Sequence, residues 1–195
     1  MGPRRTAVAD LGSNSFRLVV FSAADGWWRR TDEIYEAVRI GAGLAETGGL
    51  SAERMARGWS VVEVFDHFCR ATGIDDVVAV ATSAIRDAAN GAEFVARAAV
   101  PVRVLSREEE ARYGYLAAVN STTLADGAVL DLGGGSMQLV AVEDRRAAHL
   151  ASWPLGAVRM TERFLADGGP ASPRQLDRLR AHVAERLAAE PWVAR

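Results

Sequence analysis

Asp10-Leu-Gly-Ser-Asn-Ser-Phe-Arg-Leu-Val-Val20 has a counterpart later in the same chain, Asp131-Leu-Gly-Gly-Gly-Ser-Met-Gln-Leu-Val-Ala141. The two stretches align without gaps and share six of eleven residues: Asp, Leu, Gly, Ser, Leu and Val. In each copy a short apolar segment leads to a turn rich in small polar residues, and a second apolar segment follows, which predicts a β-hairpin. An internal repeat of this kind indicates a duplicated architecture.

The residues of the two turns suit phosphate. Glycines let a ligand approach the backbone closely, and consecutive N–H groups with Ser and Asn side chains form a concave set of donors. Asp10 and Asp131 end the first strand of each hairpin and offer hard oxygen ligands for Mg²⁺. One such turn could be explained by turn geometry alone. Because both turns carry an aspartate at the same place, the two copies together favour phosphate binding over turn geometry alone.

The flanking sequence predicts an α/β fold in two domains, residues 1–125 and 126–195. Apolar runs and helical spacing place the elements of the first domain as strands near 6–11, 16–22, 31–40, 77–81 and 102–105, and helices near 51–72, 90–99 and 106–120. Those of the second domain are strands near 127–132, 137–143 and 147–153, a helix near 155–166 stopped by Gly168-Gly169, and a helix beginning at Ser172. The second domain therefore has fewer elements than the first.

Composition narrows the function classes. The 23 basic residues are all arginine and are balanced by 25 acids, and a net charge of −2 excludes a broadly basic nucleic-acid surface. No apolar run reaches the roughly 18 residues of a membrane span, so we expect a cytoplasmic protein with neither nucleic acid nor membrane as partner. The single Cys69 excludes an internal disulfide.

Five stretches, in the same order as in a known family, carry a resemblance: residues 10–16, 81–90, 106–112, 131–136 and 154–164. They resemble the N-terminal part of the exopolyphosphatase/guanosine pentaphosphate phosphatase family, within the actin-like, sugar-kinase and heat-shock-protein-70 ATPase superfamily. The resemblance implies an actin-like (ribonuclease H-like) fold of duplicated mixed-sheet lobes that close on a phosphorylated substrate. By that comparison the second lobe is incomplete, and we expect the unsheltered apolar surface to promote self-association.

The resemblance also assigns roles. Glu110 matches the catalytic glutamate that directs the attacking water, whereas by position alone it reads as a first-turn residue favoured by the helix dipole. Asp10 and Asp131 match acids near Mg²⁺, which would bridge them through water, and Arg86 matches an arginine that reaches substrate phosphate. The two turns match phosphate-binding loops, with the residues Ser13, Asn14, Ser15, Gly133, Gly134, Gly135 and Ser136.

One residue departs from the family pattern. Where the family usually has glutamate in the metal or water site, this chain has Gln138, which keeps a carbonyl oxygen but has no negative charge. We therefore expect Gln138 to be at best a weak metal ligand, with weaker Mg²⁺ binding and weaker activation of water.

The resemblance, together with these residues, implies three candidate functions. The first is a Mg²⁺-assisted hydrolase that releases terminal phosphate from inorganic polyphosphate or from guanosine pentaphosphate, and the resemblance also allows a homodimer. The second, favoured by Gln138, is a sensor that binds guanosine tetraphosphate or polyphosphate without turnover. The third is a kinase or ATPase of the same superfamily, which Glu110 and the stretch 82–90 argue against because they are marks of the phosphatase branch.

Overall fold

A computed structural model describes residues 2–165 and 169–193. It contains two compact units, residues 1–105 and 106–195. The division lies before the helix that the sequence analysis placed in the first domain, and not at residue 125. The reason is packing: Ala111, Tyr115 and Val119 of this helix are buried against Val140 and Val142 of the second sheet.

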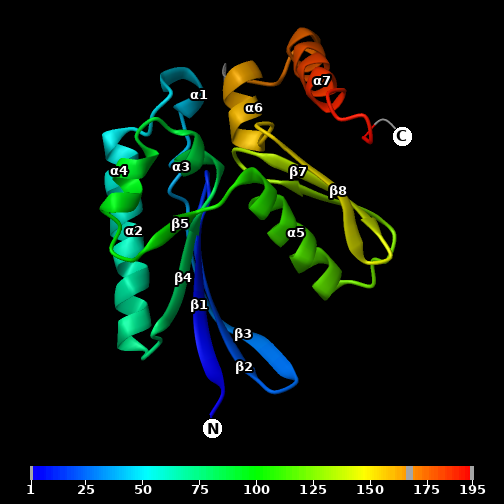
Figure 1. The fold of residues 1–195 in the computed structure, drawn as a ribbon. Coiled ribbons are helices and arrows are strands. Elements are labelled where there is room, and N and C mark those ends of the chain that lie inside the picture. Colours follow the sequence, from blue (N-terminus) through cyan, green and yellow to red (C-terminus); the bar gives the residue numbers. More distant parts are fainter. Residues whose placement is uncertain (1, 166–168, 194–195) are drawn as a thin grey trace. The chain divides into compact units, whose positions relative to one another are not determined.

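The first unit is built on a five-stranded sheet in the order β3-β2-β1-β4-β5 (Figure 1). The pairs β1–β2 and β2–β3 are antiparallel, whereas β1–β4 and β4–β5 are parallel, so the sheet is mixed as expected. The strands are β1 (Arg4–Leu11), β2 (Phe16–Ala24), β3 (Trp27–Glu36), β4 (Asp76–Ala81) and β5 (Val102–Val104).

The third strand differs from its expected bounds of 31–40, because it begins at Trp27 and ends at Glu36. Asp25 and Gly26 form a two-residue turn between β2 and β3, and Gly26 has a φ of 81°. Asp-Gly is a strong hairpin signal because the turn needs a positive φ. The turn therefore sets the start of the strand, and the exposed Trp27 and Trp28 belong to it.

Helices of the first unit complete its core. Ser51 caps the longest helix by accepting from the backbone N–H of Arg54, and that helix buries one stripe that includes Phe65 and Cys69. The side chains of Phe16, Trp59 and Phe94 stack or meet edge to face within this core. The helices are α1 (Leu44–Thr47), α2 (Ala52–Ala71), α3 (Ser83–Asp87) and α4 (Gly91–Ala96).

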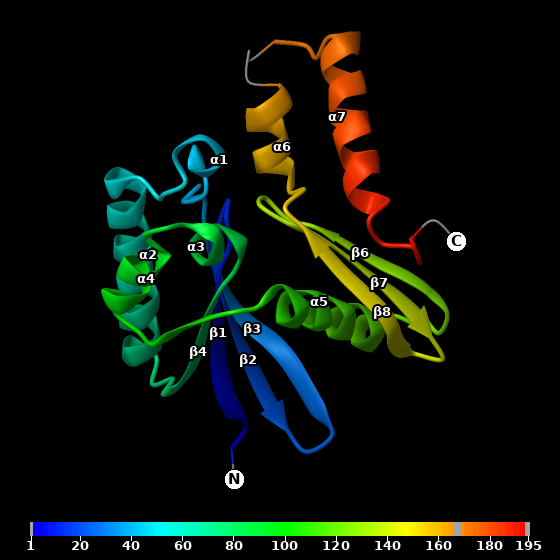
Figure 2. The ribbon, with the colours of Figure 1, turned by 45° about the horizontal axis from the view of Figure 1, so that its top comes forward.

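The second unit has a three-stranded antiparallel sheet in the order β6-β7-β8. Helix α5 packs on one face of this sheet, as Figure 2 shows, and side chains of α6 and α7 pack with residues of β7 and β8 on the other face. These elements are β6 (Gly127–Leu132), β7 (Met137–Glu143), β8 (Arg146–Trp153), α5 (Arg107–Ser121), α6 (Ala157–Phe164) and α7 (Pro173–Leu187). The predicted stop of α6 at Gly168 lies outside the described residues.

The internal repeat is a repeat of structure. In the first unit the N–H of Gly12 donates to the carbonyl of Ser15 at 3.1 Å, and in the second Gly133 donates to Ser136 at 3.0 Å. Asp10 pairs across its hairpin with Arg17, and Asp131 pairs with Gln138 at the equivalent register. The two gapless copies thus form the same hairpin and the same turn.

Strand β6 leaves apolar side chains exposed on the face that carries α6 and α7. Leu130 is 61% exposed and Leu132 is 55% exposed. Exposed apolar side chains on a strand that pairs on one side only are a liability for association. Self-association of this chain stays a prediction.

Replacing Arg145 by alanine should lower the free energy of unfolding by about 1–3 kcal/mol. Its guanidinium donates to the carbonyls of Val119, Thr122 and Leu124, which closes the C-terminal end of α5, where carbonyls lack helical partners. Chemical denaturation measures the loss. Arg146→Ala at the neighbouring position is the control, and equal losses in the two variants would contradict the capping role.

Candidate active site

In the second unit, helix α5 carries Glu110 to the glycine-rich turn of residues 133–136. Ser106 and Glu109 form a reciprocal capping box at the start of α5, with Ser106 Oγ accepting from the N–H of Glu109 at 3.1 Å and Glu109 Oε2 accepting from the N–H of Ser106 at 2.8 Å. This motif accounts for Glu109. It also fixes the first turn of α5, so that Glu110, the next residue, is held over the sheet.

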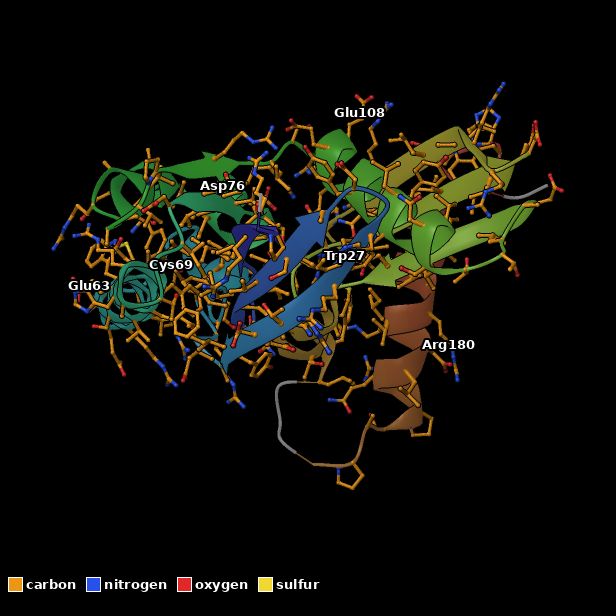
Figure 3. All side chains as sticks on the ribbon, turned by 90° about the horizontal axis from the view of Figure 1, so that it is seen from below. Trp27, Glu63, Cys69, Asp76, Glu108 and Arg180 are labelled. Carbon is orange, nitrogen blue, oxygen red and sulfur yellow. The ribbon has the colours of Figure 1, made fainter. Side chains whose placement is uncertain are left out.

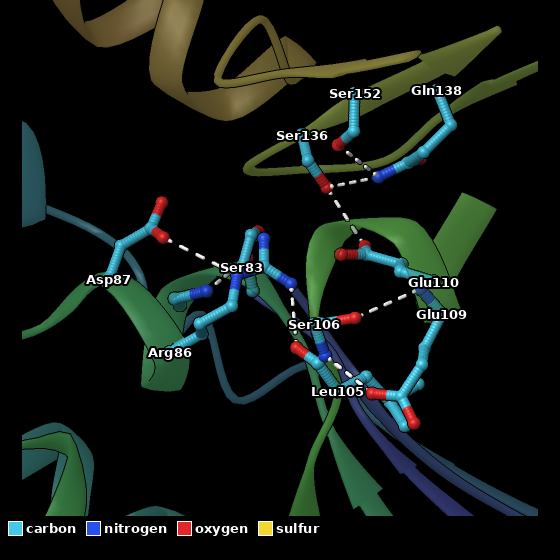
Figure 4. Close-up of polar contacts among 12 residues, drawn as sticks. Ser83, Arg86, Asp87, Leu105, Ser106, Glu109, Glu110, Ser136, Gln138 and Ser152 are labelled. Atoms are coloured by element: carbon cyan, nitrogen blue, oxygen red, sulfur yellow. Dashed lines mark hydrogen bonds and ion pairs between the residues drawn. The ribbon is translucent and has the colours of Figure 1, made fainter. Parts of the chain in front are cut away.

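A partly buried hydrogen-bond network joins Glu110 to the turn (Figure 4). Ser136 Oγ donates to Glu110 Oε1 at 2.9 Å, and Gln138 Nε2 donates to Ser136 Oγ at 2.9 Å. Gln138 Nε2 also reaches Ser152 Oγ at 3.4 Å. Ser136 is 3% exposed and Gln138 is 2% exposed, so these polar groups depend on one another for partners. Ser152, on β8, was not anticipated from the sequence.

Asp131 lies on the same face of the sheet, directly across from Gln138. A Cβ placed on Gly114 of α5 would lie 3.2 Å from Asp131 Oδ2, which shows how closely the helix passes the carboxylate. Partial desolvation, and then repulsion from the Glu110 carboxylate, raise the pKa of Asp131 above its ordinary 3.8. A cation beside these two oxygen-donor groups would relieve both effects.

The glycine-rich turn is locked against α6. The carbonyl of Gly133 accepts from the N–H of Ala157 at 2.9 Å, and that of Gly134 accepts from Val158 at 3.0 Å. A Cβ on Gly156 would lie 2.4 Å from backbone atoms of both Gly134 and Gly135, so only glycine fits at position 156. Gly156 was not among the residues nominated from the sequence, although it lies within the stretch 154–164.

The first turn is held in a different way. Ser13 Oγ lies 2.7 Å from Ser83 Oγ and accepts from the N–H of Ala84 at 3.1 Å, so the turn is tied to the start of α3. The carbonyl of Asn14 accepts from the N–H of Arg39 at 2.7 Å. The buried Ser13 hydroxyl therefore has structural partners. Ser83 is an addition that sequence reasoning did not single out.

Arg86, at the end of α3, also has partners within the first unit. Its Nη1 donates to the carbonyl of Leu105 at 3.1 Å, and its Nε lies 3.5 Å from Asp87 Oδ1. These contacts fix the base of the guanidinium near β5. Contact of Arg86 with phosphate stays a prediction, as do the phosphate contacts of Ser15 and the metal role of Asp10.

The residues nominated for metal, Asp10, Asp131 and Gln138, fall into two sets. Asp131 and Gln138 lie together in the second unit, where the catalytic candidate Glu110 is also found, and Asp10 belongs to the first unit. The amide nitrogen of Gln138 is directed to serine hydroxyls. Within the described part of the chain, no cluster of three or more His, Cys, Asp or Glu side chains could hold a metal ion. Asp131 and Glu110 therefore offer oxygen donors, without a complete ligand set of acids.

Asp131→Asn should leave the free energy of unfolding unchanged at low pH and raise it slightly at neutral pH. An acid whose folded pKa is raised stabilises the fold while protonated, and this contribution is lost as the pH rises from 3.8 through the raised value. Asparagine is neutral throughout. Melting curves at several pH values measure the difference, with Glu108→Gln as the control. A variant less stable than wild type at neutral pH would contradict this account.

The fold and the site define a class: an α/β protein with the actin-like arrangement, which repeats a turn of small residues and holds a carboxylate at one copy of that turn. The chain belongs to the Ppx/GppA phosphatase family, whose sequence model matches residues 19–195. The match begins after the first turn and includes the whole second unit.

Solved structures agree with the family. The Aquifex aeolicus member of the Ppx/GppA family is similar, with 30% identity and a TM-score of 0.76 over 96% of this chain. An exopolyphosphatase-like protein is 29% identical, with a TM-score of 0.88 over 97% of this chain. An exopolyphosphatase from Cytophaga hutchinsonii, at 22% identity and a TM-score of 0.86 over 97% of this chain, shares the fold. This chain spans 62% of the length of each of the three.

None of the helices in the described ranges combines the length and apolar character needed to cross a bilayer.

Proposed function

We propose that this protein is an exopolyphosphatase-type hydrolase that releases terminal phosphate from inorganic polyphosphate or from guanosine pentaphosphate. Family membership supports a phosphatase-type hydrolase. The observation that carries the proposal is the hydrogen bond of 2.9 Å from Ser136 to Glu110, which holds a carboxylate at the glycine-rich turn. A carboxylate fixed beside a phosphate-binding turn is what the orientation of an attacking water requires.

In the proposed reaction each residue has a separate task. The turn of Gly133–Ser136 and the equivalent turn of Ser13–Ser15 would bind phosphate oxygens through backbone N–H groups. Glu110 would orient the water and accept its proton as the water oxygen bonds to the terminal phosphorus, while the bond to the bridging oxygen breaks. Arg86 would add a forked cationic donor for the substrate's oxygens.

Mg²⁺ is part of the proposal. The residues fit it, because the pKa of Asp131 is raised by desolvation and by the neighbouring Glu110 carboxylate, and carboxylate oxygens are the donors that Mg²⁺ prefers. Asp131 would hold the ion in the second unit, and Asp10 is the corresponding acid of the first. When bound, the metal supplies positive charge that neutralises the phosphate oxygens.

A sensor that binds polyphosphate or guanosine tetraphosphate without turnover is the second candidate. Gln138 favours it, because a neutral, buried amide stands where the family usually has a glutamate. Glu110, held by Ser136, favours turnover. A cytoplasmic location and a homodimer remain part of either proposal.

Phosphate release from polyphosphate and from guanosine pentaphosphate, with Mg²⁺ and with EDTA, tests the two candidates. The hydrolase predicts release that requires Mg²⁺ and stops with EDTA. No release from either substrate, together with measurable binding of either ligand, would overturn the hydrolase in favour of the sensor.

A further inference from the structure

The direction of the hydrogen bonds around Ser136 is determined by chemistry. Its hydroxyl has one proton and lies 2.9 Å from Glu110 Oε1 and 2.9 Å from Gln138 Nε2. An ionised carboxylate can only accept, and an amide NH₂ can only donate. Ser136 therefore gives its proton to Glu110 and accepts a proton from Gln138.

The opposite orientation of the Gln138 side-chain amide would satisfy fewer hydrogen bonds. Its second N–H is directed to Ser152 Oγ at 3.4 Å, so both amide protons point at serine hydroxyls. If the amide were reversed, its oxygen and the carboxylate would compete for the one proton of Ser136. In a site where Ser136 and Gln138 are almost fully buried, water cannot supply the missing donor.

The equivalent hairpin of the first unit shows that this network is not a requirement of the fold. Ser15 and Arg17 occupy the positions of Ser136 and Gln138. Arg17 is exposed, and its guanidinium forms an ion pair with Glu33 of β3. The same hairpin thus forms with a quite different side chain at this register, and the buried glutamine is specific to the unit that carries Glu110.

We infer that Gln138 is a positioning residue: it donates a hydrogen bond to Ser136, which in turn donates to Glu110 and so holds the Glu110 carboxylate in place. The inference rests on the proposed function for its effect on catalysis. A glutamate at position 138 would keep the shape of the side chain but lose the N–H, leaving two carboxylates to share one hydroxyl proton. Glutamine supplies the donor without needing a cation. Glutamine in place of the family's glutamate at position 138 suggests weak metal binding. In this network, however, the same glutamine preserves the orientation of the Glu110 carboxylate.

Kinetics form the first arm of the test. Gln138→Met removes the donor with little change in length. It should lower kcat by about 10- to 100-fold, because small misplacements of a reacting group have effects of that size. KM for polyphosphate should stay within about twofold, since binding belongs to the turns. An unchanged kcat in Gln138→Met would overturn the inference.

Nuclear magnetic resonance of the glutamine side-chain amides forms the second arm and needs no substrate. The chain has two glutamines, Gln138 and Gln175, so selective ¹⁵N labelling gives two amide groups. Gln175 lies in the capping box of α7 and is the internal control. We expect the Gln138 amide protons to exchange with water at least about tenfold more slowly than those of Gln175, because both are donated in a buried site.

Glu110→Ala should shift the Gln138 amide signals, because Ser136 is hydrogen-bonded to both Glu110 and the amide. Glu108→Ala should leave them in place, and neither variant should shift Gln175. If the Gln138 amide signals keep their chemical shifts in Glu110→Ala, the proposed chain of hydrogen bonds is wrong, even if the protein is an active hydrolase. A protein with these shifts but no phosphate release would keep the network and refute the proposed function together with the catalytic role of Gln138.

Discussion

Glu110→Gln is expected to reduce Mg²⁺-dependent release of phosphate from polyphosphate by about 10²- to 10⁴-fold, the usual contribution of a general base. Glutamine keeps the size of the side chain and can still accept the hydrogen bond from Ser136, but it cannot take a proton from water. KM should change little, because the turns and not Glu110 bind the phosphate oxygens. Steady-state kinetics with polyphosphate and with guanosine pentaphosphate measures kcat and KM separately.

Glu108→Gln is the matched control for this experiment. Glu108 and Glu110 both lie in the first turn of α5, so each interacts favourably with the positive end of the helix dipole. Residues two apart on a helix face different directions, and Glu108 is exposed and projects away from the start of α5 (Figure 3). Equal losses of activity in both variants would mean that Glu110 acts only through the helix.

Gly156→Ala is expected to lower the free energy of unfolding by about 3 kcal/mol or more, which is at the upper end for an overpacked site. The new Cβ would lie 2.4 Å from backbone carbons of Gly134 and Gly135, and backbone cannot move aside as a side chain can. The carbonyls of Gly133 and Gly134 would also lose their fit to the first N–H groups of α6. Thermal melting should show a Tm lower by on the order of 10 °C.

A loss of phosphate binding should accompany the loss of stability in Gly156→Ala, because the same atoms shape the turn. Gly169→Ala is the control, since nothing lies within 4 Å of a Cβ at that position. Calorimetry below the Tm of each variant measures the affinity for polyphosphate. Because the protein is folded at that temperature, a lower affinity reports an altered turn and not unfolding. Normal affinity in a folded Gly156→Ala protein would contradict the role given to this contact.

Much of the architecture follows from local sequence. Two gapless copies of one eleven-residue stretch predict two hairpins, and the turn hydrogen bonds at Gly12 and Gly133 confirm them. The Ser106–Glu109 pair predicts the start of α5. Such features are readable because a turn or a cap involves neighbours in the chain, so the residues that make the contact appear together.

Contacts between distant segments were harder to predict. The sequence indicates α5 but not that Ala111, Tyr115 and Val119 pack on the second sheet, and the division at residue 105 depends on that packing. Nor did any local pattern single out Ser83, which meets Ser13 from a different part of the chain. Local signals carry no information on which of several apolar faces a helix will cover.

The sequence by itself determined the repeated turns, the acids Asp10, Asp131 and Glu110 beside or between them, and the family that these residues resemble. Only the tertiary structure decided that Glu110 accepts from Ser136, that Gln138 is a donor in that network, and that Gly156 must lack a side chain. The physical reason is that residue types and spacing are properties of the chain. Hydrogen-bond direction and steric fit exist only once α5, α6 and the hairpin have packed together.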